Sequence, residues 1–84
     1  MSLATSLAQP IQRSQAEVSA FRAENPCPST GLTKGPCPGY QRDHRDARCA
    51  GGADRAENYQ WLTIEEHRWK TRSDVRMCRM HRRQ

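Results

Sequence analysis

The sequence predicts a small α+β domain in which a β-hairpin packs on a C-terminal helix, with a further helix ahead of the hairpin. Two capping-box patterns, Ser14-Gln-Ala-Glu17 and Thr63-Ile-Glu-Glu66, each indicate the start of a helix. Between them, two short segments with aromatic residues flank Gly51-Gly52, which is typical of strands joined by a turn or loop. We expect a single domain over residues 14–84 and a flexible segment over residues 1–13.

The first helix is expected over residues 14–24, with Val18 and Phe21 turned toward the core. Asn25-Pro26 ends it, because a residue that precedes proline avoids helical backbone angles. Residues 26–39 contain four prolines and three glycines, so we expect turns and loops there.

The first strand of the hairpin is expected over residues 40–48 and the second over residues 59–62. Gly51-Gly52 supplies the turn or wide loop between them. Thr63 is expected to cap the last helix, with Glu66 reaching back to it, and this helix runs to near the C-terminus.

The composition limits the size of the core. Only 35% of the 84 residues are hydrophobic, so the chain is expected to need disulfides, a metal or a partner for stability. Trp61 is expected in the core, and so is Trp69, for which a position against DNA beside Arg68 and Lys70 is the alternative. The sequence has no apolar run of the length that crosses a bilayer, so no membrane partner is predicted.

Positive charge is concentrated near the C-terminus. The net charge is +5, and in the last seventeen residues a single acid, Asp74, opposes seven basic residues: Arg68, Lys70, Arg72, Arg76, Arg79, Arg82 and Arg83. Such a surface attracts a polyanion through phosphate contacts that carry no sequence information. The alternative is an ordinary solvated helix face. Arg outnumbers Lys twelve to two, which favours phosphate binding because the guanidinium group holds phosphate oxygens bidentately.

Four polar residues suggest a catalytic site: Asp43, His44, Asn58 and His67. Carboxylate and imidazole groups bind divalent metals, and a second imidazole can deprotonate a water that attacks phosphorus. Each residue taken alone is more simply a surface or turn residue. Neighbouring strand residues also point to opposite faces, so Asp43 and His44 can share a site only at a bulge or at the end of the strand.

At these residues the chain resembles the HNH endonuclease family, whose motif reads D-H, G-G, N-x-x-x-L and H-x-x-K. The matching segments are Asp43-His44, Gly51-Gly52, Asn58-Tyr-Gln-Trp-Leu62 and Glu66-His67-Arg-Trp-Lys70. Two further segments are similar to a group of small HNH proteins of bacteria and phages: Asn25-Pro-Cys-Pro-Ser-Thr-Gly31 and Cys37-Pro-Gly-Tyr40. The resemblance covers roughly residues 21–80.

This resemblance implies a ββα-metal fold and a role for each motif residue. It makes His44 the general base, Asp43 and His67 the ligands of one divalent ion (Mg, Mn, Ni or Zn), and Asn58 the residue that positions the loop and the base. It further implies phosphate contacts from Lys70 and nearby arginines: Arg45, Arg68, Arg72 and Arg76. The chain departs from the family at Arg45-Asp46-Ala47-Arg48, where aliphatic residues and a proline are usual, and it lacks Cys-x-x-Cys knuckles.

The function that follows is a metal-dependent endonuclease or nickase that hydrolyses DNA with little sequence specificity. A chain of this size has little room for a sequence-reading module, so specificity would come from a protein partner. The alternative is a catalytically inactive nucleic-acid-binding module, or a phage or toxin accessory protein, on the same scaffold.

The cysteines leave two alternatives open. The spacing of Cys27, Cys37, Cys49 and Cys78 fits no common zinc pattern. Disulfides Cys27–Cys37 and Cys49–Cys78 are expected, which implies an exported protein or an oxidising compartment. Some members of the resembling group look exported, which favours this pairing. The rival is a structural zinc bound by all four cysteines in a cytoplasmic protein.

Overall fold

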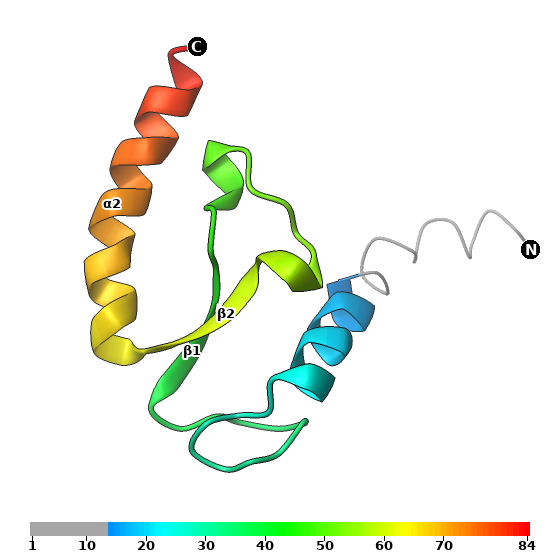
Figure 1. The fold of residues 1–84 in the computed structure, drawn as a ribbon. Coiled ribbons are helices and arrows are strands. Elements are labelled where there is room, and N and C mark those ends of the chain that lie inside the picture. Colours follow the sequence, from blue (N-terminus) through cyan, green and yellow to red (C-terminus); the bar gives the residue numbers. More distant parts are fainter. Residues whose placement is uncertain (1–13) are drawn as a thin grey trace, which may run out of the picture.

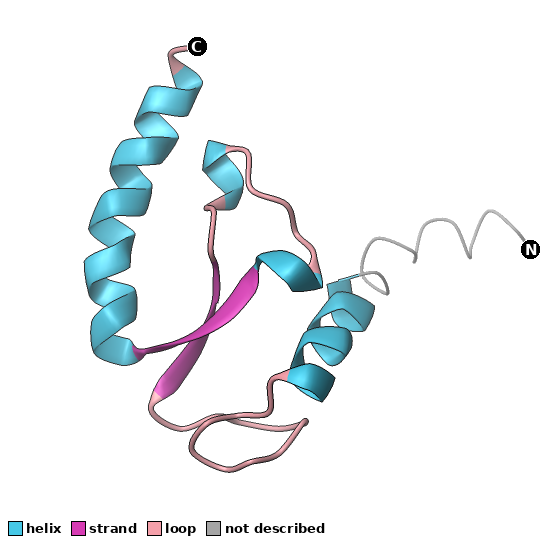
Figure 2. Cartoon of the chain, viewed as in Figure 1, coloured by secondary structure: helices cyan, strands magenta, loops and turns pink. Residues whose placement is uncertain are grey.

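The computed structural model describes residues 14–84, which form a two-stranded antiparallel sheet and two helices (Figure 1). The described elements are a helix over residues 14–24, β1 at Tyr40–His44, β2 at Tyr59–Thr63 and α2 at Ile64–Arg82. Two single 3₁₀ turns, η1 at Arg48–Ala50 and η2 at Ala56–Asn58, lie between the strands (Figure 2). This confirms the α+β class and is consistent with a ββα arrangement. The flexibility expected of residues 1–13 lies outside the described residues.

β1 is shorter than the sequence predicts. The antiparallel register pairs Asp43 with Gln60 and His44 with Tyr59, and the strand ends there. Beyond His44 the backbone turns toward Asn58, because the Arg45 N–H donates to the Asn58 carbonyl (2.7 Å) and the next N–H donates to the Asn58 side chain (3.0 Å). The predicted extension of the strand to residue 48 is therefore wrong.

The two helices lie on opposite sides of the hairpin (Figure 1). On the side of the N-terminal helix, the ring of Phe21 contacts Tyr59 and Trp61, both with centroids 5.7 Å away. Side chains alternate along a strand, so Asp43, which is one position from His44, faces the other way, toward α2. Phe21 and Tyr59 are both buried, so the core lies mainly on the first side.

Both helix-start patterns are used, but in different ways. Thr63 caps α2 as predicted: its hydroxyl accepts from the Glu66 N–H (3.0 Å), and the Glu66 carboxylate accepts from the Thr63 N–H (2.8 Å). Ser14 is already helical, and its hydroxyl donates to Asp54, while Glu17 accepts from the backbone of η2. The first pattern thus ties the N-terminal helix to the loop between the strands.

Two disulfides fix the remaining segments. Cys27–Cys37 closes the Pro- and Gly-rich loop, and Cys49–Cys78 joins η1 to α2. The expected pairing is confirmed, and no cysteine thiolate is left to bind a structural zinc. No helix within residues 14–84 is both long enough and apolar enough to cross a membrane.

Candidate nuclease site

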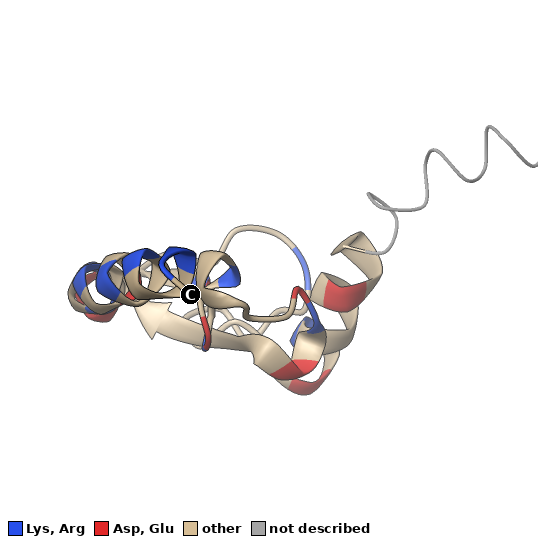
Figure 3. Ribbon diagram, turned by 90° about the horizontal axis from the view of Figure 1, so that it is seen from above, with Lys and Arg blue, Asp and Glu red and all other residues tan. Residues whose placement is uncertain are grey.

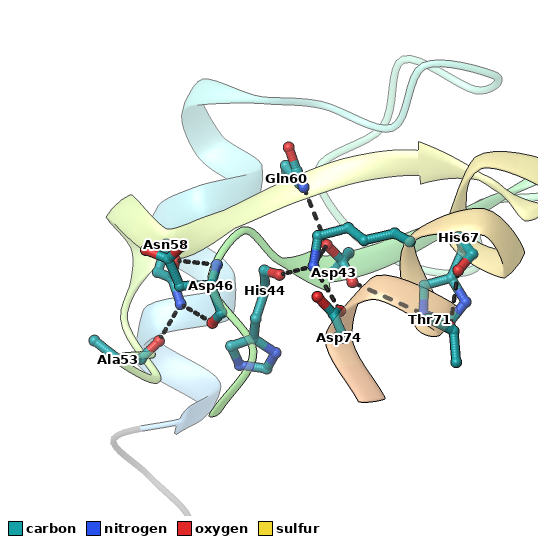
Figure 4. Close-up of polar contacts among 10 residues, drawn as sticks. Asp43, His44, Asp46, Ala53, Asn58, Gln60, His67, Thr71 and Asp74 are labelled. Atoms are coloured by element: carbon teal, nitrogen blue, oxygen red, sulfur yellow. Dashed lines mark hydrogen bonds and ion pairs between the residues drawn. The ribbon is translucent and has the colours of Figure 1, made fainter. Parts of the chain in front are cut away.

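Asp43 and His67 meet where the hairpin faces α2 (Figure 4). β2 runs directly into α2, so the first turns of this helix pass beside β1. The Asp43 Oδ1 atom lies 3.8 Å from the His67 Nε2 atom. Asp43 is 6% exposed, whereas the His67 side chain is 35% exposed. One side of the pair is therefore held inside the protein and the other is accessible.

The second oxygen of Asp43 is already engaged. Asp43 Oδ2 accepts from Gln60 (3.0 Å) and lies 3.1 Å from Lys70 Nζ, which also donates to Asp74 and to the His44 carbonyl, each at 2.7 Å. Burial lowers the pKa of Lys70, but the hydrogen bonds to Asp74 and Asp43 outweigh it, so the pKa is raised and the group is charged. The sequence predicts Lys70 as a phosphate contact, and the structure directs its ammonium group inward.

His44 lies at the end of β1, on the face opposite Asp43. No bulge intervenes, so the alternation of the strand persists up to its last residue. The His44 ring packs edge-on against Tyr59 (centroids 5.2 Å apart), and its Nε2 atom lies 3.0 Å from Asp54 Oδ1. The side chain is 26% exposed. His44 is thus partly open to solvent and held by a carboxylate.

Asp54 is the residue that sequence reasoning missed. Its carboxylate accepts from the Tyr59 hydroxyl (2.7 Å) and from Ser14 (3.1 Å), and lies 3.8 Å from Arg48. The hydrogen bond with His44, followed by that from Tyr59, holds the pKa of Asp54 well below its usual range. Burial and the hydrogen bond to Asp54 raise the pKa of Tyr59 to about 12. Asp54 lies in the loop between the strands, where the sequence has no periodic pattern. Its contact with His44 therefore becomes apparent only in the folded structure.

Asn58 closes that loop from inside. Its side chain is almost fully buried: the oxygen accepts from the Asp46 N–H (3.0 Å), and the nitrogen donates to the carbonyls of Asp46 (2.9 Å) and Ala53 (2.7 Å). Gly52 permits this closure, since a Cβ atom there would collide with the Asp46 carbonyl. Asn58 makes no hydrogen bond to His44 among residues 14–84.

Asp43 and His67 have suitable atoms for one divalent cation. Metal–oxygen and metal–nitrogen bonds are about 2.0–2.2 Å, so a cation between atoms 3.8 Å apart can contact both. Within the part of the chain that is described, no three His, Cys, Asp or Glu side chains gather closely enough to hold a metal. An ion here would complete its coordination with water and phosphate oxygens, as Mg²⁺ commonly does. The residues present fit such a two-ligand site.

The other predicted phosphate contacts lie in two places. Lys and Arg recur along α2 (Figure 3). Arg68, Arg72 and Arg76 are exposed and follow one another at intervals of four residues, which places them on one side of the helix. Trp69, 65% exposed, lies beside them with the Arg72 guanidinium 5.1 Å from its ring, so the predicted core position is wrong.

Arg45 lies elsewhere, in the wall of an open groove of about 740 Å³ between the inter-strand loop and α2. Asn58, Lys70 and Ser73 also line this groove. The groove borders the Asp43–Lys70 contact without enclosing the Asp43–His67 pair or the His44 ring. It is therefore a surface beside the candidate site.

Comparison with protein-family models, with curated proteins and with solved structures finds no match to this chain. The interpretation of the site therefore rests on its residues and their geometry.

Proposed function

We propose that this chain is an HNH-type, metal-dependent endonuclease that nicks DNA with little sequence specificity. One observation carries the proposal: the end of a single strand presents Asp43, paired with His67, on one face and a carboxylate-held His44 on the other. Together with the helix that follows the hairpin directly, this arrangement supports membership of the HNH family.

The proposal requires the phosphodiester to lie at the end of β1, where no further strand residue separates His44 from the side of Asp43. In an in-line displacement the attacking and leaving oxygens lie on opposite sides of the phosphorus. His44 accepts the proton of the attacking water on one side. Asp43 and His67 would hold a divalent ion on the other side, where it would supply stabilisation of the charge on the scissile phosphate.

Asn58 acts on this site through the loop. It holds the backbone at Asp46 and Ala53, which sets where the chain leaves β1 after His44. The segment Arg45-Asp46-Ala47-Arg48, which departs from the family pattern, is anchored by Asn58 at its start and followed at once by the Cys49–Cys78 disulfide. These contacts replace the apolar anchoring that the family usually has there.

DNA is the proposed substrate because positively charged side chains are exposed on the protein surface. The exposed arginines of α2 and Arg45 supply phosphate contacts that do not depend on base sequence. A protein partner would then provide any sequence specificity. The disulfides further suit work in an oxidising compartment.

A second candidate, an inactive DNA-binding module, is favoured by one contact. Lys70 Nζ lies 3.1 Å from Asp43 Oδ2, so an ammonium group already balances the charge of the proposed metal ligand. If this charge excludes a divalent ion, the scaffold binds DNA without cutting it.

Relaxation of supercoiled plasmid by the oxidised protein separates the two functions. The wild type, His44→Ala and His81→Ala are compared in EDTA and in Mg²⁺, Mn²⁺ and Ni²⁺. His81 is the matched control, since it is an exposed histidine near the end of α2. We expect nicking by the wild type and His81→Ala in at least one metal, none in EDTA, and a loss of about 10²- to 10⁴-fold in His44→Ala. A wild type that retards plasmid on a gel but nicks it in no metal supports the inactive module instead.

A further inference from the structure

We propose that Asp54 is the positioning residue for His44, fixing the orientation of its ring so that Nδ1 is the nitrogen that accepts the proton of the attacking water. This inference rests on the proposed nuclease function. It assigns a role to a residue outside the motif that the sequence indicates, on a loop ten residues after His44.

The hydrogen bonds determine which imidazole nitrogen carries a proton. An ionised carboxylate only accepts hydrogen bonds, so the His44 Nε2 atom, 3.0 Å from Asp54 Oδ1, must be the donor. Asp54 is ionised at neutral pH, because its hydrogen bonds hold its pKa far below the usual range. In the neutral ring the Nδ1 atom is then unprotonated, and it has no hydrogen-bond partner among residues 14–84. A proton acceptor needs such a nitrogen.

The carboxylate is itself fixed, which distinguishes this contact from a mobile surface ion pair. Oδ1 also accepts from the hydroxyl of Tyr59, a residue only 2% exposed, and Oδ2 accepts from Ser14 of the N-terminal helix. The Tyr59 ring packs edge-on against the His44 imidazole as well. Ring and carboxylate therefore share one buried support, so that neither turns freely.

The loop brings Asp54 to this place. On one side of Asp54, the Asn58 side chain donates to the carbonyl of Ala53. On the other side, two residues after Asp54, the Ala56 N–H donates to the Glu17 carboxylate. The role first expected of Asn58 is thus divided: Asn58 holds the loop, and Asp54 holds the imidazole. The effect of Asn58 on His44 runs through Asp54.

Three variants test this assignment: Asp54→Ala, Asp54→Asn and Glu57→Ala. Glu57→Ala is the matched control, because it removes a carboxylate of the same loop that is 73% exposed and forms its ion pair with Arg55. Each oxidised protein is checked for folding by circular dichroism. Two readouts follow: the Nε2–H proton resonance of His44, assigned by its absence in His44→Ala, and nicking kinetics resolved into kcat and KM.

We expect a slowly exchanging Nε2–H resonance in the wild type and in Glu57→Ala, and its loss in Asp54→Ala. Asp54→Ala should lower kcat about 10- to 100-fold with little change in KM, as loss of a residue that orients a functional histidine does. Asp54→Asn keeps an acceptor oxygen, so its kcat should lie between those of the wild type and Asp54→Ala. If Asp54→Ala does not fold, Asp54→Asn decides the question by the same readouts.

Two results overturn the inference, and they are distinguishable. If the wild type nicks plasmid and a folded Asp54 variant has the same kcat and resonance as Glu57→Ala, then Asp54 does not position His44 and the nuclease function stands. If the wild type nicks in no metal, the proposed function fails and this inference fails with it, whatever the resonance shows.

Discussion

The Asp54 carboxyl and the Tyr59 hydroxyl each make the stability of the fold depend on pH, Asp54 at acid pH and Tyr59 at alkaline pH. The folded-state pKa of Asp54 lies below that of an unfolded aspartate, about 3.9. Its contribution to stability is therefore complete above that pH and is lost as the pH falls further. Urea unfolding between pH 5 and pH 2 should show a steeper loss of stability for the wild type than for Asp54→Asn. Parallel curves would mean that the Asp54 carboxylate has no special partners in the folded protein.

Tyr59 gives the alkaline counterpart. Its pKa of about 12 exceeds the ordinary tyrosine value of about 10, so its contribution is complete below pH 10 and is lost as the pH rises toward 12. Burial and the hydrogen bond to Asp54 cause the shift. Absorbance titration of phenolate should show the Tyr59 pKa moving down in Asp54→Asn. An unchanged titration curve would contradict the Tyr59–Asp54 hydrogen bond.

Asn58 should be the most costly polar residue to remove. Asn58→Ala leaves an N–H and two carbonyls of a closed loop without partners, which should lower the free energy of unfolding by about 2–3 kcal/mol. Asn25→Ala, at an exposed amide, should cost less than about 1 kcal/mol. Chemical denaturation measures both. Equal losses would show that the buried hydrogen bonds of Asn58 contribute nothing special.

At the scale of elements, the start of α2 is the feature most firmly set by local sequence. Thr63 and Glu66 form a reciprocal cap that involves no other element. Thr63→Ala should therefore lower the free energy of unfolding by about 1 kcal/mol without changing the disulfides. Thr33→Ala, on the exposed Pro- and Gly-rich loop, serves as the control and should have little effect. A neutral Thr63→Ala would show that the start of α2 is fixed by tertiary contacts instead.

Elements without such local signals were harder to predict. The end of β1 could not be predicted from local sequence. The strand ends because the next two backbone N–H groups, of Arg45 and Asp46, donate to Asn58, which lies fourteen residues after His44. Trp69 suggested core by its size alone, yet the inward side of α2 consists of Lys70, Asp74 and Cys78. In both cases contacts distant in sequence decided the outcome.

The candidate site shows the same division. The family resemblance predicts Asp43 and His67 as ligands of one ion, and the structure places the Asp43 Oδ1 and His67 Nε2 atoms 3.8 Å apart. The prediction could not include Asp54, because its partners come from β1, β2 and the N-terminal helix. The roles of Asp43, His67 and Asp54 in hydrolysis remain predictions.

At the scale of the whole molecule, the core is too small to stabilise the fold alone. Within residues 14–84 the buried hydrophobic residues are Phe21, Cys27, Tyr59 and Cys78, and two of these four are disulfide cysteines. The disulfides close loops of 10 and 29 residues, so chain entropy predicts about 2.7 and 3.6 kcal/mol respectively.

Replacing each pair of disulfide cysteines by serine should show which disulfide contributes more to stability. The Cys49→Ser/Cys78→Ser variant should lose more stability than Cys27→Ser/Cys37→Ser, and reduction of both bonds should unfold the domain. Thermal unfolding monitored by circular dichroism, with and without reductant, measures the difference. A reduced protein that melts at the same temperature as the oxidised one would contradict this account.

The central claim is that the two faces of the β1 end act on one phosphodiester. Single-turnover plasmid nicking by His44→Ala, His67→Ala and the double variant tests it most directly. Because groups that act together in one step are strongly non-additive, the double variant should be no slower than the slower single variant, within about threefold. A double variant whose defect is the product of the two single defects, or a wild type with no metal-dependent nicking, would contradict the claim.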